Sequence, residues 1–207
     1  MFKFIDNQES SKTGVLFLHG FGADMNDLYP MKMLFPNTRV ISYQAPISLA
    51  AMGYMGGFAW FSLDFTPYGI EYDVEEAEAV LANLHKEIEK QRAHFDRLII
   101  CGFSQGAILS HALLLRYPGL LDGAVCLSGR YSDFIFEDVN HEHLKGLPVF
   151  LSHGTIDEVI PISSGKEIMS FYEDTDANLT SKVYEMGHDI SYECQLDLKE
   201  WFRSNFL

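Results

Sequence analysis

Cysteine is scarce in this sequence. Only three cysteines occur among 207 residues, Cys101, Cys126 and Cys194, and no two of them form a C-x-x-C pair. This odd number at wide spacing indicates neither a disulfide framework nor a zinc ribbon, because both need closely paired thiols. The cysteine content therefore predicts a protein of a reducing compartment.

Basic residues are also few. Fifteen Lys and Arg stand against 29 Asp and Glu, which gives a net charge of −14 with neutral His. So much negative charge repels the phosphate backbone of a nucleic acid, and the scattered Lys and Arg form no basic stripe that could bind one. We therefore expect no nucleic-acid partner.

Long apolar runs are missing. The first residues turn polar after Ile5, too early for a signal peptide, and the apolar stretch 107–115 is broken by Ser110 and His111. A helix that spans a bilayer needs about 18 to 20 apolar residues. The sequence thus predicts no stable membrane insertion and a cytoplasmic location.

The remaining composition predicts a single domain over residues 1–207. Hydrophobic residues make up 47% and charged residues 21%, which are ordinary globular proportions. Short apolar runs that are typical of strands buried on both faces occur at 15–18, 39–41, 98–101, 124–127 and 149–151, with a further strand-like segment at 180–184. Helical patterns alternate with them, which predicts a mainly parallel central sheet covered by helices on both faces.

The helical patterns have recognisable ends. Apolar residues recur at steps of three and four over 74–88, after the N-cap candidate Asp73, and further helices are expected at 26–34, 104–116, 161–172 and from about Asp189 to the C-terminus.

Residues 42–67 break the alternation of strands and helices, with glycines among many aromatic and Met side chains. We expect a long functional loop there.

The strongest chemical motif is Gly102-Phe103-Ser104-Gln105-Gly106, between a predicted strand and a predicted helix. It matches G-x-S-x-G, in which a serine in a sharp turn tolerates only small residues two positions away. A glycine-softened helix start or an N-cap serine is the alternative interpretation. A nucleophilic serine also needs a base and an orienting carboxylate.

Two downstream residues fit these roles. Asp157 lies in a loop after the strand at 149–151, and His188 follows the segment 180–184 beside Gly187. Both sit where parallel strands end, and the chain order Ser, Asp, His is that of the α/β-hydrolases. Glu158 and Asp189 are rival acids, but Asp189 is too close to His188 in the sequence and is expected to cap the last helix. Of the other histidines, four are expected at the surface (His85, His94, His141 and His143), His111 is expected to be packed or partly exposed, and His153 is expected to make a structural hydrogen bond.

An acyl-transfer site also needs donors for the oxyanion. The backbone N–H of Gln105, directly after the serine, is the first candidate, and that of Phe21 in Leu18-His19-Gly20-Phe21-Gly22 is the second. Taken alone, the second segment could equally form a tight turn or a phosphate loop. His141-Glu142-His143 has no third ligand at a suitable spacing, so we expect no metal site.

Together these motifs resemble the phospholipase/carboxylesterase family of α/β-hydrolases, which includes acyl-protein thioesterases. The matching segments are Leu18-His19-Gly20-Phe21-Gly22, Gly102-Phe103-Ser104-Gln105-Gly106, His153-Gly154, Asp157-x-Val159-Ile160-Pro161 and Met186-Gly187-His188. The resemblance implies the α/β-hydrolase fold, with Ser104 as nucleophile, His188 as base, Asp157 as its orienter, and no cofactor. It also implies that Phe58, Trp60 and Phe61 border the acyl pocket; a purely structural role for these side chains stays open.

The resulting prediction is a serine hydrolase that cleaves carboxylic esters or thioesters through an acyl-serine intermediate, with a small-molecule or acylated substrate. Two alternatives remain: a dienelactone-type or lactone-type hydrolase, and a catalytically silent hydrolase-fold protein that binds a ligand. The sequence does not fix the acyl-chain length, the preference between ester and thioester, or whether the chain forms a homodimer.

Overall fold

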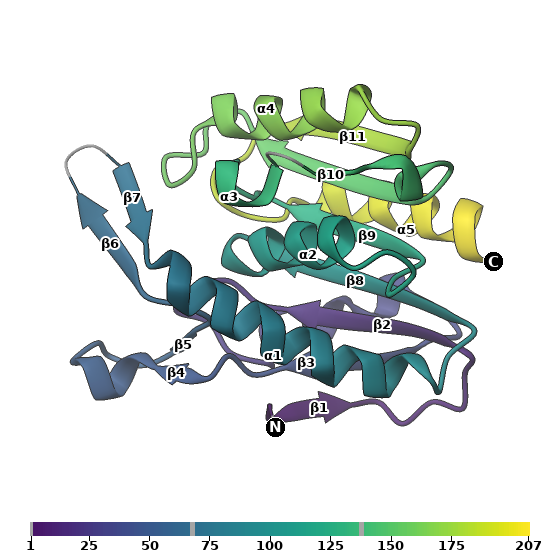
Figure 1. Ribbon diagram of the computed structural model, residues 1–207, viewed down its shortest axis with the longest axis horizontal. Helices are drawn as coiled ribbons and strands as arrows, with labels where there is room; N and C mark the ends of the chain where they lie inside the picture. Colours follow the sequence, from purple (N-terminus) through teal and green to yellow (C-terminus); the bar gives the residue numbers. More distant parts are fainter. Residues whose placement is uncertain (1, 67–68, 137–138) are drawn as a thin grey trace.

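The computed structural model describes residues 2–66, 69–136 and 139–207 (Figure 1). Within these residues, seven strands form one sheet in the order β1-β3-β2-β8-β9-β10-β11. All neighbours are parallel except β1 and β3. The strands are β1 (Phe4–Asp6), β2 (Thr13–Leu18), β3 (Arg39–Tyr43), β8 (Arg97–Phe103), β9 (Gly123–Leu127), β10 (Pro148–Gly154) and β11 (Asn178–Tyr184).

The central strands are the apolar runs that the sequence predicted. Nearly every residue of β2, β8, β9 and β10 is buried, because helices cover both faces of the sheet. Strand β11 lies at one edge and is only partly buried, which explains its weaker apolar pattern. The prediction of a mainly parallel sheet is confirmed.

Helices cover both faces of the sheet (Figure 1), and the buried apolar side chains form two core clusters. One contains side chains of α1 (Val74–Arg92), α2 (Gln105–Arg116), α3 (Asp133–Phe136) and α4 (Ile162–Glu173). The other contains side chains of α5 (Tyr192–Phe206) and the 3₁₀ helix η1 (Tyr29–Leu34). The predicted cover on both faces is therefore confirmed. No helix in the described part of the chain is both long enough and apolar enough to cross a membrane.

The helix ends follow the predicted caps only in part. Asp73 caps α1, since its side chain accepts a hydrogen bond from the backbone N–H of Glu76 at 3.0 Å. The predicted cap of the last helix was wrong: α5 begins at Tyr192, and Ser191, not Asp189, accepts from the first turn. Asp189 instead lies in the preceding turn, where its N–H donates to the carbonyl oxygen of Gly187.

The helix expected at 26–34 is also shorter than predicted. Only η1 is helical, as a 3₁₀ helix with Pro30 in its first turn. Upstream of it, the side chain of Asp24 accepts a hydrogen bond from the N–H of Asn26 at 2.7 Å. Such an aspartate turn competes with helix formation and explains the late start.

Residues 42–66 are not a structureless loop, which corrects the sequence prediction; Pro67, its expected end, lies outside the described residues. Strands β4 (Ile47–Ser48) and β5 (Phe58–Ala59) pair antiparallel around the 3₁₀ helix η2 (Leu49–Met52). Strands β6 (Leu63–Thr66) and β7 (Gly69–Tyr72) form a second small hairpin. Both hairpins project at one end of the sheet (Figure 1).

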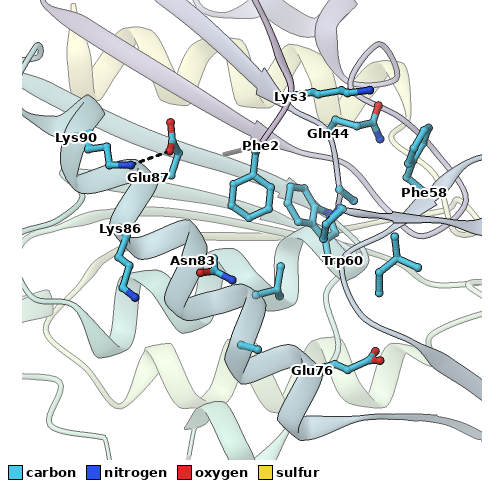
Figure 2. A pocket seen from close by; sticks show the side chains of 15 residues that line it. Phe2, Lys3, Gln44, Phe58, Trp60, Glu76, Asn83, Lys86, Glu87 and Lys90 are labelled. Carbon is cyan, nitrogen blue, oxygen red and sulfur yellow. Dashed lines mark hydrogen bonds and ion pairs between the residues drawn. The ribbon is translucent and has the colours of Figure 1, made fainter.

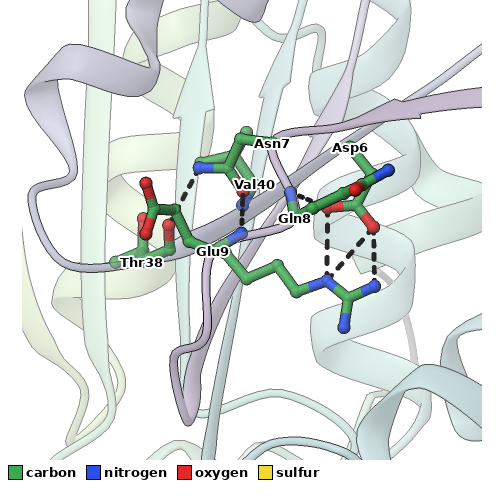
Figure 3. Close-up of polar contacts among 7 residues, drawn as sticks. Asp6, Asn7, Gln8, Glu9, Thr38 and Val40 are labelled. Atoms are coloured by element: carbon green, nitrogen blue, oxygen red, sulfur yellow. Dashed lines mark hydrogen bonds and ion pairs between the residues drawn. The ribbon is translucent and has the colours of Figure 1, made fainter.

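The edge strand β1 was not predicted, and polar contacts hold it (Figure 3). Asn7 accepts from the N–H of Val40 at 2.9 Å and donates to the carbonyl oxygen of Thr38 at 3.0 Å. The Arg39 guanidinium binds the Asp6 carboxylate at 2.6 Å. Burial raises the pKa of Asp6, but the hydrogen bonds from Arg39 and from the Gln8 N–H, together with the Arg39 charge, outweigh it and hold this pKa below its usual value.

Candidate active site

Ser104 occupies a strained turn between β8 and α2. Its φ of 53° lies in the left-handed region, which few residues other than glycine adopt. The neighbouring glycines are sterically required: a Cβ on Gly102 would lie 2.2 Å from the Gly106 carbonyl oxygen, and one on Gly106 would lie 2.0 Å from that of Leu18. The motif therefore has the backbone geometry that a nucleophile elbow needs.

The structure brings Ser104, His188 and Asp157 together. His188 Nε2 lies 2.8 Å from Ser104 Oγ, and His188 Nδ1 lies 2.7 Å from Asp157 Oδ2. Because a carboxylate only accepts hydrogen bonds, Nδ1 carries the proton and Nε2 is left to accept from the serine hydroxyl. This tautomer is the one that a general base requires.

The Asp157 carboxylate is held on both oxygens. Oδ1 accepts from the N–H groups of Val159 and Ile160 at 2.9 and 2.8 Å, while Oδ2 faces His188. Its side chain is fully buried, whereas the rival acids Glu158 and Asp189 are exposed. Both bonds to Oδ1 fix the carboxylate, so its other oxygen is aimed at the imidazole.

The remaining histidines largely lie where the sequence predicted. His153 is buried, and its Nε2–H donates to the Ile160 carbonyl oxygen at 2.8 Å, so the predicted structural hydrogen bond is confirmed. His111 is also buried, at 2.9 Å from the Tyr172 hydroxyl, and burial lowers its pKa to about 3. Of the four expected at the surface, His94 and His141 are exposed, while His85 and His143 are partly buried.

The two oxyanion candidates lie close to Ser104. Gln105 is the first residue of α2, so its N–H has no acceptor within its own helix. A Cβ on Gly20 would lie 3.3 Å from the Ser104 Cβ, which shows that the backbone leading to Phe21 passes directly beside the serine. Whether these N–H groups bind an oxyanion stays a prediction.

The three residues predicted to border the acyl pocket differ in exposure. Trp60 and Phe61 are buried in the core, and Phe58 is partly buried. Phe58 and Trp60 line a cavity of about 700 Å³ between α1, the N-terminal segment and the β4–β5 hairpin, with the Trp60 and Phe2 rings side by side (Figure 2). Ser104 does not line it. The burial favours a packing role for Trp60 and Phe61, and substrate contact by the three residues stays a prediction.

Exposed apolar side chains whose sequence pattern gave them no role flank the candidate catalytic residues. Ile156 and Val159, on either side of Asp157, are 61% and 46% exposed. Tyr54 is exposed in the β4–β5 hairpin, and its ring contacts that of Phe21. Composition could not separate these side chains from core residues, since exposure depends on how the loops fold.

Acidic side chains also lie on the loops beside the candidate catalytic residues. Burial is the main cause that raises the pKa of Asp27, and the negative charges of Asp24 and Asp189 raise it further against the opposing effect of His19. These three carboxylates lie on the loops that carry Phe21 and His188. Within the described ranges, no three His, Cys, Asp or Glu side chains are grouped to hold a metal ion.

The chain is similar to known proteins over nearly its whole length. The model of the phospholipase/carboxylesterase family matches residues 2–205. Among curated relatives, acyl-protein thioesterase 1 of Kluyveromyces lactis is 29% identical over 209 residues, with 93% of this chain and 92% of the relative covered. Carboxylesterase SOBER1 of Arabidopsis thaliana is 26% identical over 207 residues, with 93% and 90% covered.

Solved structures show the same architecture. The Bacillus cereus carboxylesterase superposes with a TM-score of 0.84 at 24% identity, with 100% of this chain and 95% of that chain covered. The SOBER1 structure from Arabidopsis thaliana gives a TM-score of 0.78 at 26% identity, with 94% and 99% covered. The chain therefore has the α/β-hydrolase fold.

Proposed function

The chain belongs to the phospholipase/carboxylesterase family, and we propose that it is a serine hydrolase that cleaves carboxylic esters or thioesters through an acyl-serine intermediate. The observation that carries the proposal is the pair of short contacts that joins Ser104 to His188 and His188 to Asp157. The names of the relatives support the same reaction class, since they are carboxylesterases and acyl-protein thioesterases.

In the proposed acylation step, Ser104 Oγ attacks the carbonyl carbon of the substrate as His188 Nε2 takes the hydroxyl proton. The tetrahedral intermediate then collapses: the bond to the leaving alcohol or thiol breaks, and His188 gives its proton to that group. A water molecule repeats the sequence on the acyl-serine and releases the carboxylic acid. Asp157 holds the imidazole and stabilises its positive form throughout.

The charge that develops on the carbonyl oxygen needs donors in place before the reaction. The N–H groups of Phe21 and Gln105 are the proposed donors, supported by their positions beside Ser104. Loss of one such donor typically costs about 100-fold to 1000-fold in kcat. No bound cofactor takes part in the proposed steps.

The proposed substrate has an apolar acyl group and lacks strong negative charge. Exposed Ile156, Val159 and Tyr54 offer apolar contacts around the catalytic residues. Asp24 and Asp27 add negative charge on the loop that carries Phe21, in a chain of net charge −14, and repel anionic groups. A cytoplasmic location also stays a proposal, supported by three free, buried thiols.

Hydrolysis of p-nitrophenyl acetate, butyrate and octanoate, together with an octanoyl thioester, tests the function. We expect the wild type to prefer the longer acyl chains, and we expect Ser104→Ala and His188→Ala to lose at least about 10⁴-fold in kcat. His94→Ala, at an exposed histidine, is the matched control and keeps full activity. Full activity in Ser104→Ala refutes the proposed nucleophile, and a strong preference for acetate refutes the apolar substrate.

A further inference from the structure

The Gln105 side chain is buried and bound within the protein. It is 2% exposed, and both ends of its carboxamide bind backbone groups of one segment. Its Oε1 accepts from the Trp60 N–H at 2.8 Å, and its Nε2 donates to the Phe61 carbonyl oxygen at 2.7 Å. Because an amide has one donor end and one acceptor end, these bonds fix its orientation and tie the start of α2 to residues 60–61.

The same segment also binds the loop that carries Phe21. The Gly22 N–H donates to the Phe58 carbonyl oxygen at 3.0 Å, and the Phe58 N–H donates to the Ala23 carbonyl oxygen at 2.9 Å. Trp60 Nε1 donates to the His19 carbonyl oxygen at 2.8 Å. The backbones approach so closely that a Cβ on Gly57, where φ is 83°, would lie 2.0 Å from the Gly22 oxygen.

The His19 ring orients the peptide group that contains the Phe21 N–H. Its Nε2 accepts from the Ala45 N–H at 3.1 Å, so Nδ1 carries the proton and donates to the Gly20 carbonyl oxygen at 2.7 Å. Burial lowers the pKa of His19, which keeps the ring neutral in this role. In a trans peptide the C=O and N–H point in opposite directions, so a fixed Gly20 oxygen also fixes where the Phe21 N–H points.

We propose that residues 58–61, the Gln105 carboxamide and the His19 ring form one positioning frame that sets the distance between the two oxyanion donors. The inference rests on the proposed function. It deepens that function by giving Trp60, and the side chain of Gln105, a role in transition-state stabilisation without contact with the substrate. The donors act only within about 2.7 to 3.1 Å of the oxyanion, and a displacement of about 1 Å can cost on the order of 100-fold in rate.

The variants Gln105→Met and Trp60→Phe test the frame. Gln105→Met removes both hydrogen bonds of the carboxamide and keeps a side chain of similar length, whereas Trp60→Phe removes the bond from indole Nε1 and keeps a smaller aromatic ring. Tyr172→Phe is the matched control: it removes a buried hydrogen bond, that to His111, away from the frame. For each protein, kcat and KM for a p-nitrophenyl ester, the inhibition constant of an alkyl boronic acid, and Tm are measured.

We expect kcat to fall about 10-fold to 100-fold in Gln105→Met and Trp60→Phe, with KM within about threefold of the wild type. Boronic acid affinity falls by the same factor as kcat/KM, because the tetrahedral adduct needs both donors. Tyr172→Phe lowers Tm and leaves kcat unchanged. If Gln105→Met does not fold, Trp60→Phe alone decides, since it keeps an aromatic ring in the core.

The inference is overturned if the Tm of a frame variant falls but its kcat stays within twofold of the kcat of Tyr172→Phe. It is also overturned if KM rises in the frame variants while kcat stays unchanged. Either result, with an active wild type and an inactive Ser104→Ala, leaves the proposed function intact. A folded wild type without esterase or thioesterase activity contradicts the proposed function itself, and the frame's catalytic role with it.

Discussion

Replacement of Asp157 by Asn separates the orienting role of this residue from its structural role. Asp157 Oδ1 accepts two backbone N–H groups, while Oδ2 accepts from His188 Nδ1 at 2.7 Å. An Asn side chain keeps the two backbone bonds only if its oxygen takes the place of Oδ1. Its NH₂ group then faces His188, so Nδ1 must become the acceptor and the proton moves to Nε2.

That tautomer change sets the size of the effect. With a proton on Nε2, His188 cannot accept the Ser104 hydroxyl proton, and the nucleophile loses its base. A carboxylate-to-amide change in a serine triad costs about 10⁴-fold in kcat, which is about 5.4 kcal/mol of activation free energy. Stability changes little, because the N–H groups of Val159 and Ile160 keep their acceptor. Asp157→Ala leaves both unpaired, at about 1 to 3 kcal/mol each.

The assay is steady-state hydrolysis of a p-nitrophenyl ester together with urea denaturation of the same samples. We expect Asp157→Asn to unfold near the wild-type midpoint with kcat about 10⁴-fold lower, and Asp157→Ala to lose both activity and stability. If Asp157→Asn keeps more than a tenth of the wild-type kcat, the tautomer argument is refuted, and the contact with His188 is only structural.

Two other predictions concern the elbow and the core. Gly106→Ala places a Cβ 2.0 Å from the Leu18 oxygen, so we expect a lower Tm and at least about a 100-fold loss of kcat. Gly119→Ala is the control: its φ of 79° strains the backbone, but its Cβ would meet nothing within 4 Å, so we expect it to keep its activity. An active Gly106→Ala contradicts the steric argument. The pKa of His111 is about 3 when folded and about 6.5 when unfolded, so the unfolded state takes up the proton first and stability falls as pH falls. Between pH 7 and pH 5 we expect the wild type to lose about 2 kcal/mol more than His111→Gln in urea denaturation, and equal losses would show that this ring is not held neutral.

The parallel strands and the helices packed on them could be predicted because burial imposes a pattern on the sequence. Strands β8 and β10 are buried almost throughout, so they appear as unbroken apolar runs. Short elements carry no such pattern: β1 spans three residues and β5 spans two, and backbone pairing with distant segments defines them. The early cap at Asp189 failed because Asp and Ser are both good caps, and residues 187–189 form a local turn, so that Ser191 caps the helix.

The sequence could also identify the three residues that the fold brings together at Ser104, since chain order and strand ends restrict where a triad can form. It could not separate pocket from core among the aromatic residues at 58–61. A Trp is equally suited to both environments, and its role depends on which backbone groups its indole meets. The bond from Trp60 Nε1 to the His19 oxygen is visible only in three dimensions.

The most direct test of the central claim is the site of covalent modification by a fluorophosphonate, located by mass spectrometry of proteolytic peptides. We predict a single phosphonyl adduct on the peptide that contains Ser104, no adduct in Ser104→Ala, and a strongly slowed reaction in His188→Ala. A folded wild type that stays unmodified, or an adduct that persists in Ser104→Ala, would contradict the claim that His188 activates the Ser104 hydroxyl.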